Sequence, residues 1–196
     1  NRYGSTAEVG IFNMKDTGLE PVSNPSAVLL AERQVADGSI VMAAMEGTRP
    51  ILVEIQALVN RTSFGYPKRA ASGFDLNRLN LLTAVLTRRT KLDLSEHDVY
   101  INVVGGIKIT EPAADLAVCM AIASAAKGMQ LKDDAVVFGE VGLSGEVRHV
   151  PNIEQCIKEV KHLGFKKAVG PKSDTTSTLL ASVSSLKDAL NTYLKT

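Results

Sequence analysis

The stretch Val103–Ala126, VVGGIKITEPAADLAVCMAIASAA, decides the fold. The β-branched residues at its start favour a strand, and the glycine pair that follows permits a bend or a close backbone approach. Pro112 suits the first turn of a helix, because its missing N–H would have no partner there in any case. After Pro112 only Asp115 and Ser124 are strongly polar, so the helix has no broad solvent face. At about 14 residues it is shorter than the roughly 20 that cross a bilayer, and the sequence predicts a buried core helix.

A β-hairpin is predicted before this core helix, and shorter elements follow it. Ser39–Glu46 and Ile51–Val59 are apolar runs divided by a short Gly/Pro loop, which favours an antiparallel hairpin. Further strands are expected at 135–138, 140–143, 146–150 and 166–169, and amphipathic helices at 76–90, 152–163 and 185–194. Because strands and helices do not alternate regularly, the sequence predicts an α+β domain with mixed sheets and packed helices.

The composition is that of one globular domain. Of the 196 residues 45% are hydrophobic, which is enough for a sizeable core, and no apolar run is long enough for a signal sequence or a membrane span. Cys119 and Cys156 lack metal-ligand spacing and are expected to be packing residues in a reducing compartment. We therefore expect a cytoplasmic protein.

Positive charge is concentrated between Arg61 and Lys91. This segment holds seven basic residues and one acidic residue, a net charge of +6, whereas the whole chain has a net charge of +1. Such a patch is the electrostatic footprint of a protein that contacts a phosphate backbone. The candidate DNA-binding residues are Arg61, Lys68, Arg69, Arg78, Arg88, Arg89 and Lys91, and Arg49 or Lys108 could belong with them.

Within this segment the candidate DNA-binding residues are predicted to lie on a helix and on the loop before it. Asp75 is a good N-cap for a helix that ends near Thr90, and Arg78 and Arg89 are expected to share one face of it at about 16 Å. The preceding residues 62–69 mix Gly, Pro, aromatic and basic residues, which suits a mobile loop along a nucleic-acid strand. The alternative is structural, because basic residues near a helix C-terminus complement its dipole and arginines often pair with acids of a neighbouring subunit. Three aromatic residues near the patch could serve such an interface: Phe64, Tyr66 and Phe74.

Several ordered motifs of this chain, from NRYGSTAEVGIFNM at its start to GEVGLSGEVRHV near residue 150, resemble the RadA (Sms) family of bacterial DNA repair proteins. The opening NRYGSTAEVGIFNM resembles the junction after the RecA-like ATPase core of that family. The remnant of its Lys-Asn-Arg-Phe/Tyr-Gly motif is Asn1, Arg2, Tyr3 and Gly4. The resemblance continues through GLEPVSNPSAVLL, EGTRPILVEIQALV, RAASGFDLNRLNLLTAVLTRR, DVYINVVGGIKITEPAADLAV and GEVGLSGEVRHV, and nothing is carried over to the tail from Lys172 to Thr196. It implies a junction at 1–14 and a Lon protease-like domain, of the α+β P-domain fold, at 15–196.

The same resemblance locates the positions of the Ser–Lys pair that Lon proteases use for catalysis. The serine position holds Ala113 and the lysine position holds Glu154. Alanine has no nucleophilic atom, and a carboxylate cannot replace the lysine that accepts the serine proton. The resemblance therefore implies a peptidase scaffold without peptidase activity, and a working Ser–Lys peptidase is the less favoured alternative.

The resemblance implies a non-catalytic DNA-binding and oligomerisation domain of an ATP-dependent repair protein that promotes branch migration of recombination intermediates. ATP, Mg²⁺ and Zn²⁺ would be bound by other regions of the longer protein, and this stretch would hold no cofactor. Expected partners are single- or double-stranded DNA, further copies in a hexameric ring, RecA and other recombination proteins, and no membrane. The expected location is the bacterial cytoplasm, on the nucleoid. The alternative is a purely structural oligomerisation module that never touches DNA.

Other reactive groups are weaker candidates. Ser124 and Lys127 lie three apart on the core helix, a spacing that is common by chance. Glu111 and Asp115 could hold a cation or act as acid and base, although solvated or capping carboxylates are the simpler interpretation. The three histidines show no zinc-ligand spacing: His97, His149 and His162.

Overall fold

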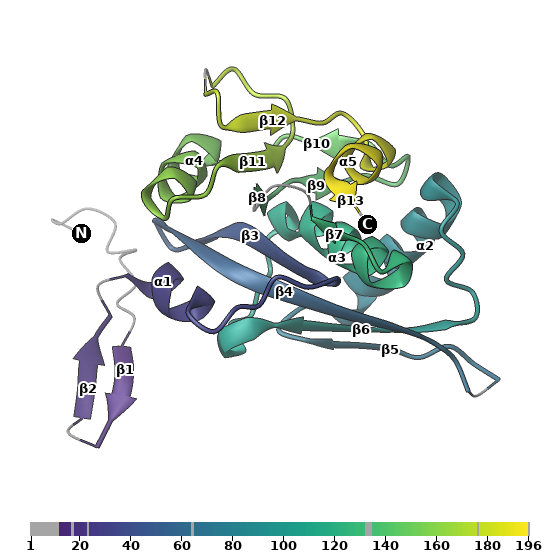
Figure 1. Ribbon diagram of the computed structural model, residues 1–196, viewed down its shortest axis with the longest axis horizontal. Coiled ribbons are helices and arrows are strands. Elements are labelled where there is room, and N and C mark those ends of the chain that lie inside the picture. Colours follow the sequence, from purple (N-terminus) through teal and green to yellow (C-terminus); the bar gives the residue numbers. More distant parts are fainter. Residues whose placement is uncertain are drawn as a thin grey trace, which may run out of the picture.

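The computed structural model describes residues 12–16, 18–22, 24–63, 65–131, 135–175 and 177–195 (Figure 1). The motif remnant Asn1, Arg2, Tyr3 and Gly4, and Phe64, lie outside the described residues. The helices are α1 (Pro25–Leu30), α2 (Leu76–Thr90), α3 (Asp115–Lys127), α4 (Ile153–His162) and α5 (Leu186–Tyr193). The strands are β1 (Phe12–Lys15), β2 (Gly18–Pro21), β3 (Ser39–Glu46), β4 (Arg49–Arg61), β5 (Arg69–Ser72), β6 (His97–Val103), β7 (Gln130–Leu131), β8 (Ala135–Val137), β9 (Glu140–Val141), β10 (Val147–Arg148), β11 (Lys167–Gly170), β12 (Leu180–Ser182) and β13 (Leu194–Lys195).

A mixed seven-stranded sheet forms the centre, with the order β12-β11-β8-β3-β4-β6-β5. The predicted hairpin is confirmed as β3 and β4, which pair antiparallel, and β4 also pairs antiparallel with β6. The other four pairings are parallel. The prediction of a mixed sheet with packed helices is thus confirmed, but the sheet is more parallel than an α+β label implies. The reason is that α2 connects the parallel neighbours β5 and β6, and α4 precedes β11, the parallel neighbour of β8.

The predicted core helix is confirmed as α3. A 3₁₀ turn at Pro112–Ala114 leads into it, every residue from Asp115 to Ser124 is buried, and Gly128 ends it in the left-handed conformation with φ 60°. Glycine adopts this conformation without steric cost and is the usual residue just past a helix. The helix packs against β3, β4, α2 and α5, so residues far apart in the sequence depend on it.

Two apolar clusters lie on opposite faces of the sheet. In β3, Ile40 and Met42 join a cluster with α2, α3 and α5, whereas Val41 and Ala43 join a smaller cluster with α4. This alternation follows from the two-residue period of a strand. In the described part of the chain no helix covers the outer face of the later half of β4, where Gln56 and Leu58 are exposed. Among the described residues no helix is long and apolar enough to cross a membrane.

Candidate nucleic-acid interface

Five of the seven candidate DNA-binding residues gather where β4 ends, β5 begins and α2 ends. Arg69, Arg88 and Lys91 line one shallow hollow over α2, together with residues of the segment that leads into β6. Arg61 lies beside His97 in the β4–β6 register, and Lys68 directly precedes β5. We call this surface the basic end, and it consists of Arg61, Lys68, Arg69, Arg88 and Lys91.

Helix α2 carries Arg88 and Lys91 to the basic end. It starts at Asp75, whose side chain accepts the backbone N–H of Arg78 at 2.7 Å, as the N-cap prediction requires. It ends at Lys91, which is left-handed with φ 61°. Arg88 and Lys91 are both exposed, and among the described residues neither has a hydrogen-bond or ion-pair partner. Within the basic end they are therefore the cations most available to a ligand.

Arg69 has a structural role in the basic end. Its guanidinium donates to the backbone carbonyls of Lys68 and Leu94 at 2.9 Å, and to that of His97. Burial lowers the pKa of Arg69, and the nearby Asp98 carboxylate opposes that shift. The side chain thus ties the start of β5 to the segment before β6, and it shapes the hollow without being a free cation.

Acidic residues from outside the Arg61–Lys91 segment reduce the charge of the basic end. Arg61 pairs with Glu96 at 3.1 Å, and their side chains are 80% and 67% exposed. The Asp98 carboxylate accepts the N–H of Lys68 at 2.7 Å, a bond that lowers the pKa of Asp98. Asp93 lies between Lys91 and Glu96, in the segment that leads into β6. Adding Asp93, Glu96 and Asp98 to the five residues of the basic end gives this surface a net charge of +2, lower than the +6 of the Arg61–Lys91 segment.

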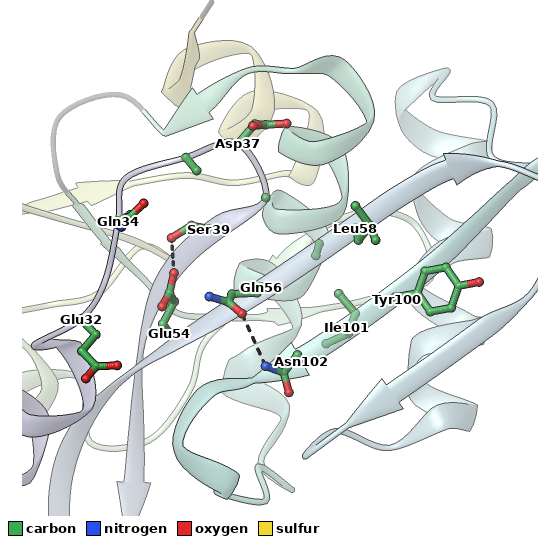
Figure 2. A pocket seen from close by; sticks show the side chains of 13 residues that line it. Glu32, Gln34, Asp37, Ser39, Glu54, Gln56, Leu58, Tyr100, Ile101 and Asn102 are labelled. Carbon is green, nitrogen blue, oxygen red and sulfur yellow. Dashed lines mark hydrogen bonds between the residues drawn. The ribbon is translucent and has the colours of Figure 1, made fainter.

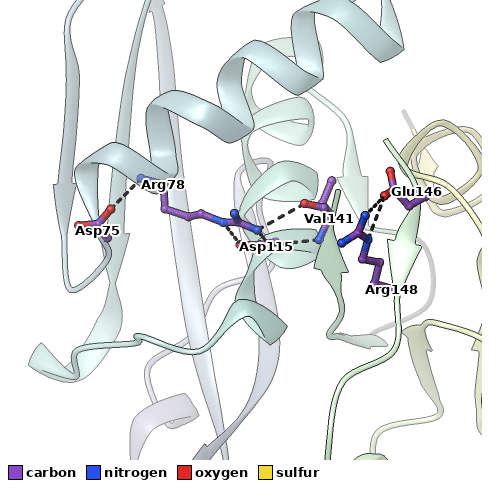
Figure 3. Close-up of polar contacts among 6 residues, drawn as sticks. All are labelled: Asp75, Arg78, Asp115, Val141, Glu146 and Arg148. Carbon is purple, nitrogen blue, oxygen red and sulfur yellow. Dashed lines mark hydrogen bonds and ion pairs between the residues drawn. The ribbon is translucent and has the colours of Figure 1, made fainter. Parts of the chain in front are cut away.

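Arg78 and Arg89 share one face of α2 as predicted, but this face is turned toward β9 and the turn after it. Arg78 forms two hydrogen bonds to the Asp115 carboxylate and donates to the carbonyl of Val141 at 3.4 Å (Figure 3). Arg89 donates to the carbonyl of Leu143 at 3.1 Å. The expectation of an outward, phosphate-tracking pair is therefore corrected: Arg78 in particular serves the interior.

The Arg78–Asp115 pair joins α2, α3 and β9. Burial raises the pKa of Asp115, while Arg78 and the N–H of Val141, 3.1 Å away, oppose that shift. The hydrogen bond to Asp115 raises the pKa of Arg78. A second ion pair, Glu146 with Arg148 at 2.6 Å, lies nearby at the surface (Figure 3). Asp115 is thus neither solvated nor a free acid–base group.

A second hollow lies on the uncovered face of β4 and β6 and has the opposite electrostatic character (Figure 2). Glu32, Asp37 and Glu54 line it. Glu54 is only 3% exposed and accepts a hydrogen bond from the Ser39 hydroxyl. Its carboxylates make this hollow unsuitable for a phosphate backbone, so the basic end is the better candidate for nucleic acid.

The two positions to which the resemblance assigns the Ser–Lys pair, Ala113 and Glu154, carry no nucleophile–base pair. Ala113 is 6% exposed in the turn before α3 and packs in the smaller cluster with residues of α4, whereas Glu154 is exposed in the first turn of α4. The alternative serine, Ser124, is fully buried; its hydroxyl accepts the N–H of Gly38 at 2.7 Å and donates to the carbonyl of Met129. Lys127 is exposed at the end of α3. Ser124 therefore fixes the backbone just before β3 to the end of α3 through these two hydrogen bonds.

Metal and thiol chemistry find no support in the part of the chain that the structure describes. Within it, no group of three His, Cys, Asp or Glu residues is placed to hold a metal ion. Cys119 and Cys156 are both buried and unpaired, which confirms them as packing residues. Burial raises the pKa of Cys156 to about 12, so it is a poor nucleophile at neutral pH.

The partly buried carboxyl group of Glu111 should make the stability of the domain depend on pH, and this can be tested. Its carboxylate accepts the N–H of Met45 at 2.7 Å, and burial raises its pKa above the ordinary value, against the effect of that bond. A raised pKa in the folded state means that Glu111 contributes stability below its unfolded pKa and loses it as pH rises through the folded pKa. We expect Glu111→Gln, which keeps the acceptor, to raise Tm at pH 7. The gain should vanish toward pH 4 in thermal unfolding scans, and a gain independent of pH would contradict this account.

Three residues that the sequence placed near the basic patch lie elsewhere in the structure. Phe74 is 9% exposed within the main core, so it is not an interface residue of the described chain. Arg49 begins β4 while Arg61 ends it, roughly 40 Å away at the usual strand rise. Lys108 lines an apolar hollow beside α1. Tyr66 is 87% exposed and stays a candidate.

Comparison with known proteins sets this fold and surface in context. The structure defines a mixed α/β domain with a mostly parallel sheet, and residues 78–174 match the family model of subunit ChlI of Mg-chelatase. DNA repair protein RadA of Halalkalibacterium halodurans is 47% identical over 99% of this chain and 44% of its own length. The RadA proteins of Bacillus subtilis and Escherichia coli are 51% and 45% identical, over 89% and 98% of this chain and 38% and 43% of their own lengths.

All three of these relatives are RadA proteins, with sequence identities of 45% to 51%. The chain is homologous to the bacterial DNA repair protein RadA and corresponds to the C-terminal part of that protein. It spans less than half the length of the curated relatives that it matches.

Proposed function

We propose that this chain is a DNA-binding and ring-forming domain of a RadA-type repair protein, with a Lon-like fold and no peptidase activity. The observation that carries the proposal is the pair Arg88 and Lys91, which stand exposed and without a partner among the described residues beside a hollow that Arg69 shapes. Arg88 and Lys91 contact backbone phosphates. Arg61 and Lys68 flank them, and the Arg61–Glu96 pair opens at little cost because exposed ion pairs contribute about 0–1 kcal/mol.

The domain's role in the longer protein follows from the family. In this proposal it holds six subunits together and grips DNA while an ATPase ring drives branch migration of recombination intermediates. ATP, Mg²⁺ and Zn²⁺ are bound by other regions of the longer protein, and RecA and other recombination proteins act on the same DNA. The protein works in the bacterial cytoplasm, on the nucleoid.

The absence of peptidase activity is part of the proposal. Its support is that Ala113 has no nucleophilic atom and that Ser124 spends its hydroxyl on two backbone groups. A fluorophosphonate serine probe should therefore leave the chain unlabelled. Labelling at any serine would overturn this part.

DNA binding is tested by fluorescence anisotropy of labelled single- and double-stranded DNA across a salt titration. If phosphate contacts dominate, the logarithm of affinity falls linearly with the logarithm of salt concentration, by about 0.9 per phosphate contact on duplex DNA. No binding at low salt by a protein that still assembles, measured by light scattering, would refute it. That outcome would favour the purely structural oligomerisation module.

A further inference from the structure

The first described element is an amphipathic hairpin whose apolar face is bare. Strands β1 and β2 pair antiparallel, with Phe12 opposite Pro21 and Met14 opposite Leu19. Residues directly opposite each other, and residues two apart on one strand, lie on the same face. Phe12, Met14, Leu19 and Pro21 therefore form one apolar face, and the first three are 54%, 75% and 64% exposed.

This face continues into an apolar hollow of about 490 Å³ at the base of the hairpin. Phe12 reaches the hollow, and α1 supplies Val28 and Leu29 to its wall, with Val28 52% exposed. The other apolar lining residues are Val22, Pro25, Ile51 and Ile107, and Glu46, Gly105 and Lys108 complete the lining. The bare surface thus extends from the tip of the hairpin to the body of the domain.

The hairpin stands away from the rest of the domain (Figure 1). Among the described residues its strands pair only with each other and do not join the seven-stranded sheet. An isolated two-stranded hairpin is at best marginally stable in water, and packing of its apolar face is what normally stabilises one. The amphipathic pattern therefore indicates a partner beyond the described residues.

We propose that the apolar face of β1–β2 and the adjoining hollow are the docking site for the region that precedes this stretch in the full-length protein. The matching stretch is the C-terminal part of the RadA relatives, and more than half of each relative's length lies outside it. The hairpin begins at Phe12, so any preceding region is joined to it by a tether that includes the eleven residues before Phe12. A tether gives that region a high effective concentration at the hairpin, which favours it over a second copy of the domain.

This placement separates the two surfaces of the domain. The hairpin lies at one end of the molecule and the connection between β4 and β5, which belongs to the basic end, lies at the other (Figure 1). The proposal does not rest on DNA binding, because none of its residues belongs to the basic end. The docked hairpin would fix the orientation of the domain relative to the preceding region.

Photo-crosslinking in the full-length protein tests this site. Met14→p-benzoylphenylalanine and, as a second position, Leu19→p-benzoylphenylalanine place the probe on the bare face. A matched control, Leu143→p-benzoylphenylalanine, places it at a side chain that is 64% exposed, as Leu19 is, in the turn after β9. We expect crosslinked peptides from the preceding region at both hairpin positions, at least ten-fold above the control, in mass spectra.

Mixing ¹⁵N-labelled with unlabelled protein before irradiation identifies the chain that is crosslinked. Crosslinks to the preceding region of the same chain support the proposal, because the tether acts within one chain. Crosslinks from the hairpin to a neighbouring chain, whether to its preceding region or to its copy of the domain, would overturn the proposal, and so would yields equal to the Leu143 control. DNA binding by the basic end can fail while this result stands, so the two proposals are separable.

Discussion

Replacing Asp115 with alanine is expected to destabilise the domain by about 3–5 kcal/mol, the usual cost of breaking a buried ion pair by removing one partner. The Asp115 side chain is 1% exposed, and it accepts two hydrogen bonds from Arg78 and one from the N–H of Val141. Its removal leaves the Arg78 guanidinium and the Val141 N–H without their acceptor. Urea unfolding followed by circular dichroism measures the loss.

A matched variant and a double variant sharpen this test. Arg89→Ala removes a cation from the helix face that also carries Arg78. Because Arg89 is exposed and its Nε makes one hydrogen bond, we expect the domain to lose about 0.5 kcal/mol of stability or less. Arg78→Met combined with Asp115→Leu should cost less than Asp115→Ala, because no unpaired charge stays behind. A change below about 0.5 kcal/mol for Asp115→Ala would show that the pair does not hold α2 to α3.

The elements with long, strong patterns could be predicted from the sequence. The buried helix α3, the β3–β4 hairpin and the helix α2 with its Asp75 cap all follow from local signals, namely apolar periodicity, turn residues and a capping side chain. The short strands could not. β5 is the four-residue run RAAS, which carries no strand signal of its own and is a strand because β6 supplies its hydrogen bonds.

The candidate site was only half visible in the sequence, for two physical reasons. A charge count over one segment leaves out residues from other segments that the fold places beside it. Here the pairing of β4 with β6 places the acidic residues of 93–98 next to the basic residues. Helical spacing correctly predicted that Arg78 and Arg89 share one face of α2, but spacing alone does not show whether a face is turned toward solvent or toward the protein. Only the position of Asp115, buried on α3, shows that Arg78 is turned toward the interior, whereas Arg89 on the same face is exposed.

The double variant Arg88→Ala with Lys91→Ala is expected to weaken DNA binding about ten-fold and to reduce the salt slope by about 2, one unit for each lost phosphate contact. Both side chains are exposed, and among the described residues they have no partner to lose. Unfolding curves should therefore match the unmodified protein, and anisotropy with labelled DNA measures the change in binding.

The matched control is Lys158→Ala with Lys161→Ala, two exposed lysines of α4. Both double variants remove two positive charges, so a diffuse electrostatic attraction would weaken binding equally in both, because net charge acts at long range. Contacts with phosphates act locally, and only the α2 variant would then change the salt slope. Equal losses in the two variants would refute a phosphate site at the basic end. Loss confined to the α4 variant would move the DNA-binding surface to that helix.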